Sequence, residues 1–243
     1  MANWSDPRIG ASQPTTTVGR DVAFDAGLRA HMLSVYNYMT SGVLLSGIVA
    51  MLFARSGMAF DIMVNGGLLR WVIILAPLGM VMWLSFGINR ISTATAQILF
   101  WVFAFVMGLS LSTIFLVYDL PSIATTFFAT AAAFAGLSLW GYSTKKDLSA
   151  IGTFLVMGLF GLIVAMLINV FWQNTMFDLV ISAIGVLIFA GLTAWDTQKI
   201  KEMYDVNEDG TVTGRKAVMG ALSLYLDFIN LFLFLLRFMG NRN

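Results

Sequence analysis

The stretch AVMGALSLYLDFINLFLFLLRF, residues 217–238, is almost entirely apolar, and Asp227 lies in its middle. A run of about 20 apolar residues can cross a bilayer as one helix. An acidic residue at that depth is costly, so it faces the interior of a helix bundle, where it has a partner or a function. Asp196 lies near the end of the preceding apolar run, in FAGLTAWDTQKI. Two acidic residues in consecutive spans predict that their side chains meet.

The composition of the chain also points to a membrane. Of 243 residues, 58% are hydrophobic and 11% are charged, and the mean hydropathy is +0.82. About a quarter of a soluble domain is charged, so this chain cannot cover its surface in water. A net charge of +1 without a basic cluster argues against nucleic-acid binding. Because the chain has no Cys and only His31, disulfides and multi-histidine metal sites are excluded.

Apolar windows along the chain predict an all-α integral membrane protein with seven transmembrane helices. Residues 1–32 are polar and lack the apolar core of a signal peptide, so they predict a polar cytoplasmic tail before a membrane domain at 33–243. The breaks between most spans are short, which predicts antiparallel neighbours in a compact bundle. The predicted spans are residues 34–54, 70–88, 97–118, 123–142, 150–171, 177–198 and 217–238.

The distribution of Lys and Arg predicts the orientation of the chain, because cytoplasmic loops carry the excess. On the seven-span assignment, ten of these residues lie on the side of the N-terminus and four on the other side. This favours a cytoplasmic N-terminus, and an odd number of spans then places the C-terminus outside. The ten are Arg8, Arg20, Arg29, Arg90, Lys145, Lys146, Lys199, Lys201, Arg215 and Lys216, and the four are Arg55, Arg70, Arg237 and Arg242.

A polar stripe accompanies Asp227 on the last predicted span. On a helical wheel, Ser223 and Asn230 fall within about 60° of Asp227, and Arg237 falls within about 80°. At 1.5 Å per residue, Asp227 lies about 15 Å into the span and so near mid-membrane. The stripe must face the bundle interior. It either lines a functional site or hydrogen-bonds neighbouring helices together.

Two carboxyl groups that share a low-dielectric pocket have a restricted chemistry. Both cannot stay ionised without a cation, so Asp196 and Asp227 would share a proton. Protonation or an added cation would then bias the helix arrangement, as in a pH-sensitive switch. Carboxylate oxygens also suit hard cations such as Ca²⁺. Spacing alone leaves open whether Asp196 is interfacial, and whether Arg90 is an ordinary membrane anchor or the counter-charge of the pair.

Four segments together resemble the Bax inhibitor-1 family, also called transmembrane Bax inhibitor motif proteins, and this chain is similar to its bacterial members. The resemblance covers nearly the whole chain from about residue 28, and LYLDFINLF is its most specific part. The segments are MGALSLYLDFINLFLFLLRFMG (219–240), AWDTQKIKEMY (194–204), STKKDLS (143–149) and AFVMGLSLS (104–112).

The resemblance implies a seven-helix bundle in which the last helix is central and is wrapped by the other six. It also implies a pH-sensitive Ca²⁺ leak in a bacterial cytoplasmic membrane. The resemblance implies that a carboxylate pair, which matches Asp196 and Asp227 here, acts as a lock that holds the leak closed. It also implies that an arginine, which matches Arg90, engages this pair. Some relatives carry an acid inside the second span, where this chain has only ILAPLGMVMW (74–83).

A second function class remains open beside the channel. The protein would then be a non-conducting, membrane-embedded regulator that docks a partner through residues 1–32 and 199–216. One bacterial branch of the family modulates a membrane-bound ATP-dependent protease, so the resemblance makes such a protease a candidate partner. In both classes the chain is expected to have no enzymatic activity and no bound cofactor, with the lipid bilayer, Ca²⁺ and protons as its other partners.

Two further patterns carry less weight. DVNEDGTVT (205–213) matches the first half of an EF-hand loop, but Lys216 stands where a bidentate Glu is needed, which favours a solvated turn over a Ca²⁺ contact. The paired aspartates also suggest an intramembrane aspartyl protease. The contexts AWD and YLD lack the GxGD motif of those enzymes. Their downstream PAL motif is also missing, because no Pro follows Pro121.

Overall fold

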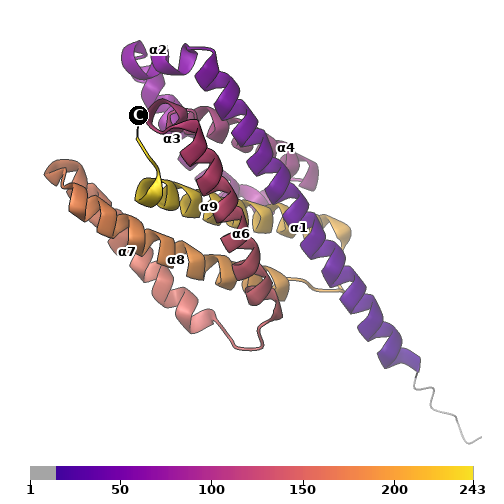
Figure 1. Cartoon of the computed structure of the whole chain (residues 1–243). Coiled ribbons are helices and arrows are strands. Elements are labelled where there is room, and N and C mark those ends of the chain that lie inside the picture. The colour runs from indigo at the N-terminus through magenta and orange to yellow at the C-terminus, as the bar shows by residue number, and fades with distance from the viewer. Residues whose placement is uncertain (1–14, 243) are drawn as a thin grey trace, which may run out of the picture.

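The computed structural model describes residues 15–242, which form a bundle of helices (Figure 1). The only β-type pairing among these residues is an isolated antiparallel bridge between Tyr118 and Arg242. The elements are α1 (Thr15–Arg55), α2 (Met58–Asn65), α3 (Leu68–Gly87), η1 (Ile88–Arg90), α4 (Thr93–Leu111), α5 (Ile114–Val117), α6 (Leu120–Ser143), α7 (Ser149–Trp172), α8 (Thr175–Glu202) and α9 (Gly210–Met239).

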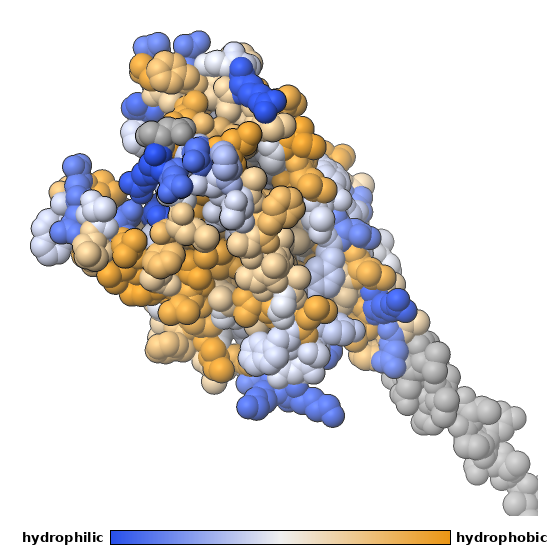
Figure 2. Space-filling model, viewed as in Figure 1, coloured by the Kyte–Doolittle hydropathy of each residue, from blue (hydrophilic) through white to orange (hydrophobic). Residues whose placement is uncertain are grey.

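Seven segments of the described chain are long and apolar enough to cross a membrane, as the sequence predicts. They are Phe24–Arg55, Leu68–Gly87, Thr93–Val117, Leu120–Ser143, Ser149–Trp172, Thr175–Glu202 and Gly210–Met239. Figure 2 shows hydrophobic residues over the middle of the molecule and hydrophilic residues gathered toward its ends. The exposed apolar surface therefore has the distribution that a bilayer requires.

The first helix begins earlier than the predicted boundary between tail and membrane domain. Helix α1 starts at Thr15 and continues without a break into the first span, whereas residues 1–14 of the predicted tail lie outside the described residues. The early start has a packing reason, because Leu28 and Met32 are buried. The ring centroids of Phe24 and Tyr204 lie 5.5 Å apart, which joins α1 to the segment after α8.

Helix α9 is the central helix of the bundle, as predicted. Of its most apolar window, 67% is buried inside the protein, against 6–33% for the other six spans. Its direct neighbours are α1, α4, α6 and α8, while α3 packs mainly against α4 and α7 packs against α8. Four spans therefore enclose α9 directly, and two lie in an outer layer.

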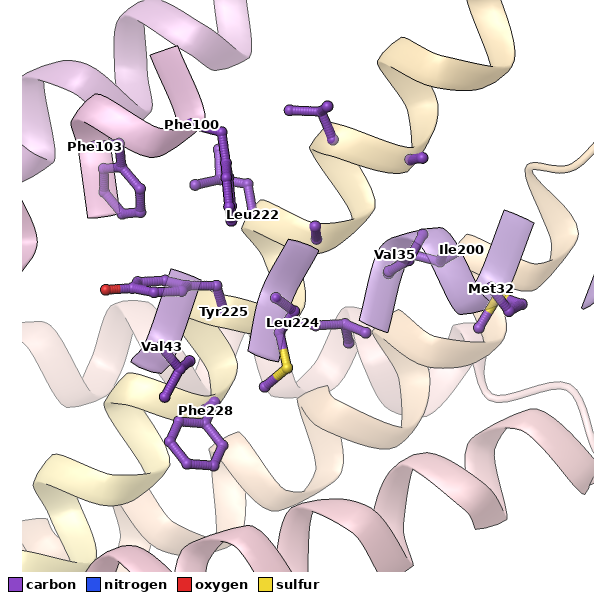
Figure 3. Packing of buried hydrophobic residues seen from close by; sticks show 14 of the residues in the cluster. Met32, Val35, Val43, Phe100, Phe103, Ile200, Leu222, Leu224, Tyr225 and Phe228 are labelled. Atoms are coloured by element: carbon purple, nitrogen blue, oxygen red, sulfur yellow. The ribbon is translucent and has the colours of Figure 1, made fainter. Parts of the chain in front are cut away.

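The core around α9 is built from aromatic and aliphatic side chains (Figure 3). Tyr225 is fully buried, and its ring meets Phe103 edge-on at a centroid distance of 5.2 Å. Its hydroxyl is hydrogen-bonded to the Ser46 hydroxyl at 2.6 Å. Ser46 also donates to the Ala104 carbonyl oxygen at 2.6 Å. The Ser46 hydroxyl therefore joins α1 to both α4 and α9 inside the apolar core.

Glycines allow the closest contacts between α7, α8 and α9. A Cβ on Gly152 of α7 would overlap the indole ring of Trp195 on α8, and a Cβ on Gly185 of α8 would overlap the ring of Phe234 on α9. Larger residues at these positions would push the helices apart, as in other membrane bundles with small residues at their interfaces. The α7–α8–α9 packing therefore fixes where Trp195, and next to it Asp196, lies.

Candidate functional site

The structure brings Asp196 and Asp227 together, on the antiparallel helices α8 and α9. Their carboxyl groups are close neighbours, and both side chains line one cavity. Asp227 is only 5% exposed, and Asp196 is partly buried. A carboxylate can only accept hydrogen bonds, so a bond between two carboxyl groups requires one proton shared by the pair.

The sequence places the two carboxyls opposite each other because α8 and α9 pack closely on both sides of the pair. On one side, Ile200 lies against Gly220, and on the other, Phe234 lies against Gly185. The second carboxyl oxygen of Asp227, Oδ2, is buried and has no hydrogen-bond partner. A buried acceptor without a partner is costly, so the site has the capacity to take up another donor or a cation.

A cavity of about 730 Å³ runs along α9 and contains both carboxyl groups. Its walls come from α3, α4, α7, α8 and α9, so α3 and α7 approach the central helix across this space. Its polar lining residues come from three of these helices, and α3 and α7 contribute only apolar side chains. The polar members are Ser110, Asp196, Lys199, Ser223, Asp227, Asn230 and Arg237.

The predicted polar stripe on α9 lies in the wall of this cavity. Ser223, Asn230 and Arg237 all line it with Asp227. Asn230 donates from Nδ2 to the Leu226 carbonyl oxygen at 2.8 Å, which leaves its side-chain oxygen available. The stripe therefore faces this cavity, and among the described residues no side-chain hydrogen bond joins Ser223 or Asn230 to another helix.

Arg90 is not brought to the pair. It ends η1 with an exposed side chain, and it is not among the residues that line the cavity. Helix α3 packs mainly on α4, and the segment after η1 reaches the first turns of α9, where Arg215 Nη1 donates to the Ile91 carbonyl oxygen at 3.3 Å. Two other cations line the cavity, Lys199 toward the end of α8 and Arg237 toward the end of α9.

The end of the cavity at Arg237 holds an ion-pair cluster of two arginines and one aspartate. Arg237 Nη1 lies 3.8 Å from Asp178 Oδ1, and Arg242 Nη2 lies 3.4 Å from Asp178 Oδ2. Asp178 is in the first turn of α8, so these contacts tie the last turn of α9 and the following segment to the start of α8. Arg237, ten residues further along α9 than Asp227, is thereby paired with Asp178.

The oxygen atoms at the pair make up only part of the ligand set that Ca²⁺ takes. In the described part of the chain, no three His, Cys, Asp or Glu residues gather as a metal cluster. Ca²⁺ takes six to eight oxygen ligands. Two carboxyl groups with Ser223 and Asn230 nearby supply some of these, and water would supply the rest.

The EF-hand-like segment is a turn and a helix cap. Asp205 Oδ1 accepts hydrogen bonds from the backbone and side-chain amides of Asn207, both at 2.9 Å. Asp209 caps α9 by accepting from the Thr211 hydroxyl and from the backbone N–H groups of Thr211 and Val212. These hydrogen bonds, led by that of the Thr211 hydroxyl, lower the pKa of Asp209. The carboxylates are used locally, as a solvated turn requires.

Comparisons with known proteins agree with this architecture. The model of the family described as inhibitor of apoptosis-promoting Bax1 matches residues 28–243. A protein of Rickettsia prowazekii (strain Madrid E) is 45% identical over 234 residues, which cover 96% of this chain and 99% of that protein. The inner membrane protein YbhL of Escherichia coli (strain K12) is 43% identical over 219 residues, which cover 89% of this chain and 94% of YbhL. The chain therefore belongs to the Bax inhibitor-1 family.

Proposed function

We propose that this protein is a pH-sensitive cation leak whose main substrate is Ca²⁺, gated by the Asp196–Asp227 pair. The observation that carries the proposal is that two carboxyl groups, Asp196 and the buried Asp227, line one cavity inside a bundle of candidate membrane spans. Ionisable groups at such depth are costly and mark ion or proton pathways. The protein would lie in the inner membrane, as YbhL does by its name, with the α8–α9 connection on the cytoplasmic side.

The cavity supports a path for the ion. It extends along α9 from the level of Ser223 to that of Arg237, a rise of about 21 Å at 1.5 Å per residue. Most of a hydrocarbon core of about 30 Å would thus be bridged by a space whose polar groups come from α4, α8 and α9. The remaining barrier lies at the pair, where α8 and α9 are in contact.

The pair would act as a lock through its charge. With one shared proton, the hydrogen bond holds α8 and α9 together. Loss of that proton leaves two like charges in contact, which repel unless a cation enters between them. The same oxygens then replace part of the hydration shell of the ion, so opening of the lock and binding of the substrate use one pair of side chains.

The test is Ca²⁺ flux into liposomes that contain the purified protein and an internal Ca²⁺ indicator. External pH is stepped from about 8 to about 6, and the flux is recorded at each step. Asp196→Asn and Asp227→Asn are run beside Asp61→Asn, a matched control on the exposed side of α2. The proposal requires a pH-dependent flux that both site variants lose and the control keeps.

Two results would contradict the proposal. A native protein whose flux does not exceed that of empty liposomes at any pH is not a leak, and the regulator class then stands in its place. A native flux with a pH profile that both site variants retain would show that the pair is not the lock.

A further inference from the structure

A second cavity lies between α1 and α6 and shares no lining residue with the cavity of the carboxyl pair. Both helices pack on α9, but in the described chain they are not a closely packed pair themselves. The groove between them has a volume of about 470 Å³, which is within the range of sites that bind small molecules. Its lining includes Val43 of α1 and Phe228 of α9 (Figure 3), together with Phe127 and Phe134 of α6.

The groove opens sideways, toward the bilayer. Leu44 on α1 and Leu139 on α6 line it and are 54% and 67% exposed, and both lie in candidate membrane spans. Phe228, by contrast, is 4% exposed, so it lies deep in the groove. None of the lining residues is charged, and a charged group without a partner is costly at this depth. An occupant that enters from the bilayer therefore brings hydrocarbon or an uncharged polar group.

Three hydroxyl groups from three helices form a hydrogen-bonded chain at this groove. Thr197 of α8 donates its proton to the Thr193 carbonyl oxygen at 2.7 Å. The Thr197 hydroxyl is also 2.9 Å from the Ser138 hydroxyl of α6, which is 2.7 Å from the Tyr36 hydroxyl of α1. Thr197 and Ser138 are buried and Tyr36 is half-buried. Tyr36 and Ser138 both line the groove.

The direction of each hydrogen bond in this chain follows from its fixed end. A hydroxyl has one proton to donate. Because Thr197 gives its proton to a carbonyl oxygen, Ser138 must donate to Thr197 and Tyr36 must donate to Ser138. The Tyr36 oxygen then has acceptor capacity left and no proton to give. Thr40, the remaining polar lining residue, directs its hydroxyl to Met39 Sδ at 4.0 Å.

We propose that this groove binds a neutral membrane lipid with a free hydroxyl group, of the diacylglycerol class. One hydrocarbon chain lies against the aromatic side chains, and the lipid hydroxyl donates a hydrogen bond to the Tyr36 oxygen. A phosphodiester headgroup brings a negative charge, for which the lining offers no partner. Replacing the lipid hydroxyl by an ether removes the donor that the Tyr36 oxygen requires. The inference goes beyond the proposed leak and does not rest on it.

The experiment is photolabelling of the full chain in liposomes, followed by mass spectrometry of the labelled peptides. Three probes carry the same diazirine in an acyl chain: a diacylglycerol, its O-methyl ether and a phosphatidylcholine. Tyr36→Phe removes the acceptor and keeps the ring. Ala135→Leu fills the groove from α6, and Ala133→Leu is its matched control, an exposed position on the same helix outside the lining.

In the native protein, the diacylglycerol should label residues that line the groove about twofold to tenfold more than its O-methyl ether does, as expected for one hydrogen bond. Tyr36→Phe should abolish this preference, and circular dichroism checks that the variant is folded. Ala135→Leu should remove the labelling in the groove by both probes, and Ala133→Leu should leave it unchanged.

Three results would overturn the inference. Equal labelling of the native protein by the diacylglycerol and its ether would show that the hydroxyl is not recognised. A preference that persists in folded Tyr36→Phe would place the recognition elsewhere. Labelling by the phosphatidylcholine as strong as that by the diacylglycerol would show that ordinary bilayer lipid fills the groove. The native comparison is decisive even where a variant does not fold, and none of these readings depends on ion flux.

Discussion

The contact between Gly152 of α7 and Trp195 of α8 makes one prediction that does not touch the carboxyl pair. Gly152 is buried, and a Cβ there would overlap three atoms of the indole ring. Gly161 lies on the same helix, is exposed, and has no atom within 4 Å of an added Cβ. Gly152→Ala and Gly161→Ala are thus the same chemical change in one helix, with and without a neighbour.

The magnitude follows from two opposing effects. Alanine in place of glycine in a helix interior gains about 1 kcal/mol at either position. Only at Gly152 does the added methyl group also overpack the interface, which costs about 1–3 kcal/mol. The two variants should therefore differ by about 1–3 kcal/mol in free energy of unfolding, with Gly152→Ala the less stable. At about tenfold per 1.4 kcal/mol, this is roughly a fivefold to 150-fold difference in the unfolding equilibrium.

The assay is reversible unfolding in mixed micelles with increasing sodium dodecyl sulfate, followed by circular dichroism. Tryptophan fluorescence, recorded in parallel, should change in folded Gly152→Ala and not in folded Gly161→Ala, because only the first displaces Trp195. A Gly152→Ala protein that is as stable as Gly161→Ala, with native fluorescence, would refute the close α7–α8 packing that positions Asp196.

Two further predictions concern polar contacts of α9. Tyr225→Phe removes the hydroxyl bonded to Ser46 and keeps the ring packed on Phe103. Unfolding with sodium dodecyl sulfate should show that the free energy of unfolding falls by about 0.5–1.5 kcal/mol. An unchanged free energy of unfolding would mean that the hydrogen bond does not form. Asp209 caps α9, and its pKa is lowered in the folded protein. The charged cap therefore stabilises the folded protein fully above the ordinary pKa of 3.8, and this stabilisation is lost as the pH falls through the lower pKa of the folded state. Amide chemical shifts of Thr211 and Val212 should reach those of Asp209→Ala only below pH 3.8, and a transition at higher pH would contradict the lowered pKa.

The parts of this fold that follow from local sequence were predictable. Seven apolar windows gave seven spans because burial in lipid leaves few alternatives to a helix. Asp196 and Asp227 were expected to lie close together, because two costly charges in adjacent spans are stabilised by sharing a site, and the structure places both in the wall of one cavity. The polar stripe of Ser223 and Asn230 was predictable from helix geometry alone, and the structure places both residues in the cavity wall.

The parts that depend on packing between distant segments were not predictable in the same way. The exposed side chain of Arg90 follows from how α3 packs on α4, which no local pattern encodes. Lys199 had a local signal, the three-residue spacing from Asp196, but its position in the cavity wall depends on which face of α8 meets α9. In the early part of α1, Phe24 packs on Tyr204, which lies far along the chain.

Because α9 is the last of the described spans to leave the ribosome, the helix most enclosed by the others is also the last to be made. Until it arrives, α1, α4, α6 and α8 lack the partner that covers their inner faces, and Asp196 stands in the bilayer without Asp227. A nascent chain stopped before residue 210 therefore carries an unpaired acid in lipid. Such a chain differs from the finished protein in a way that a membrane quality-control protease can recognise, so completion of synthesis and completion of folding coincide in α9.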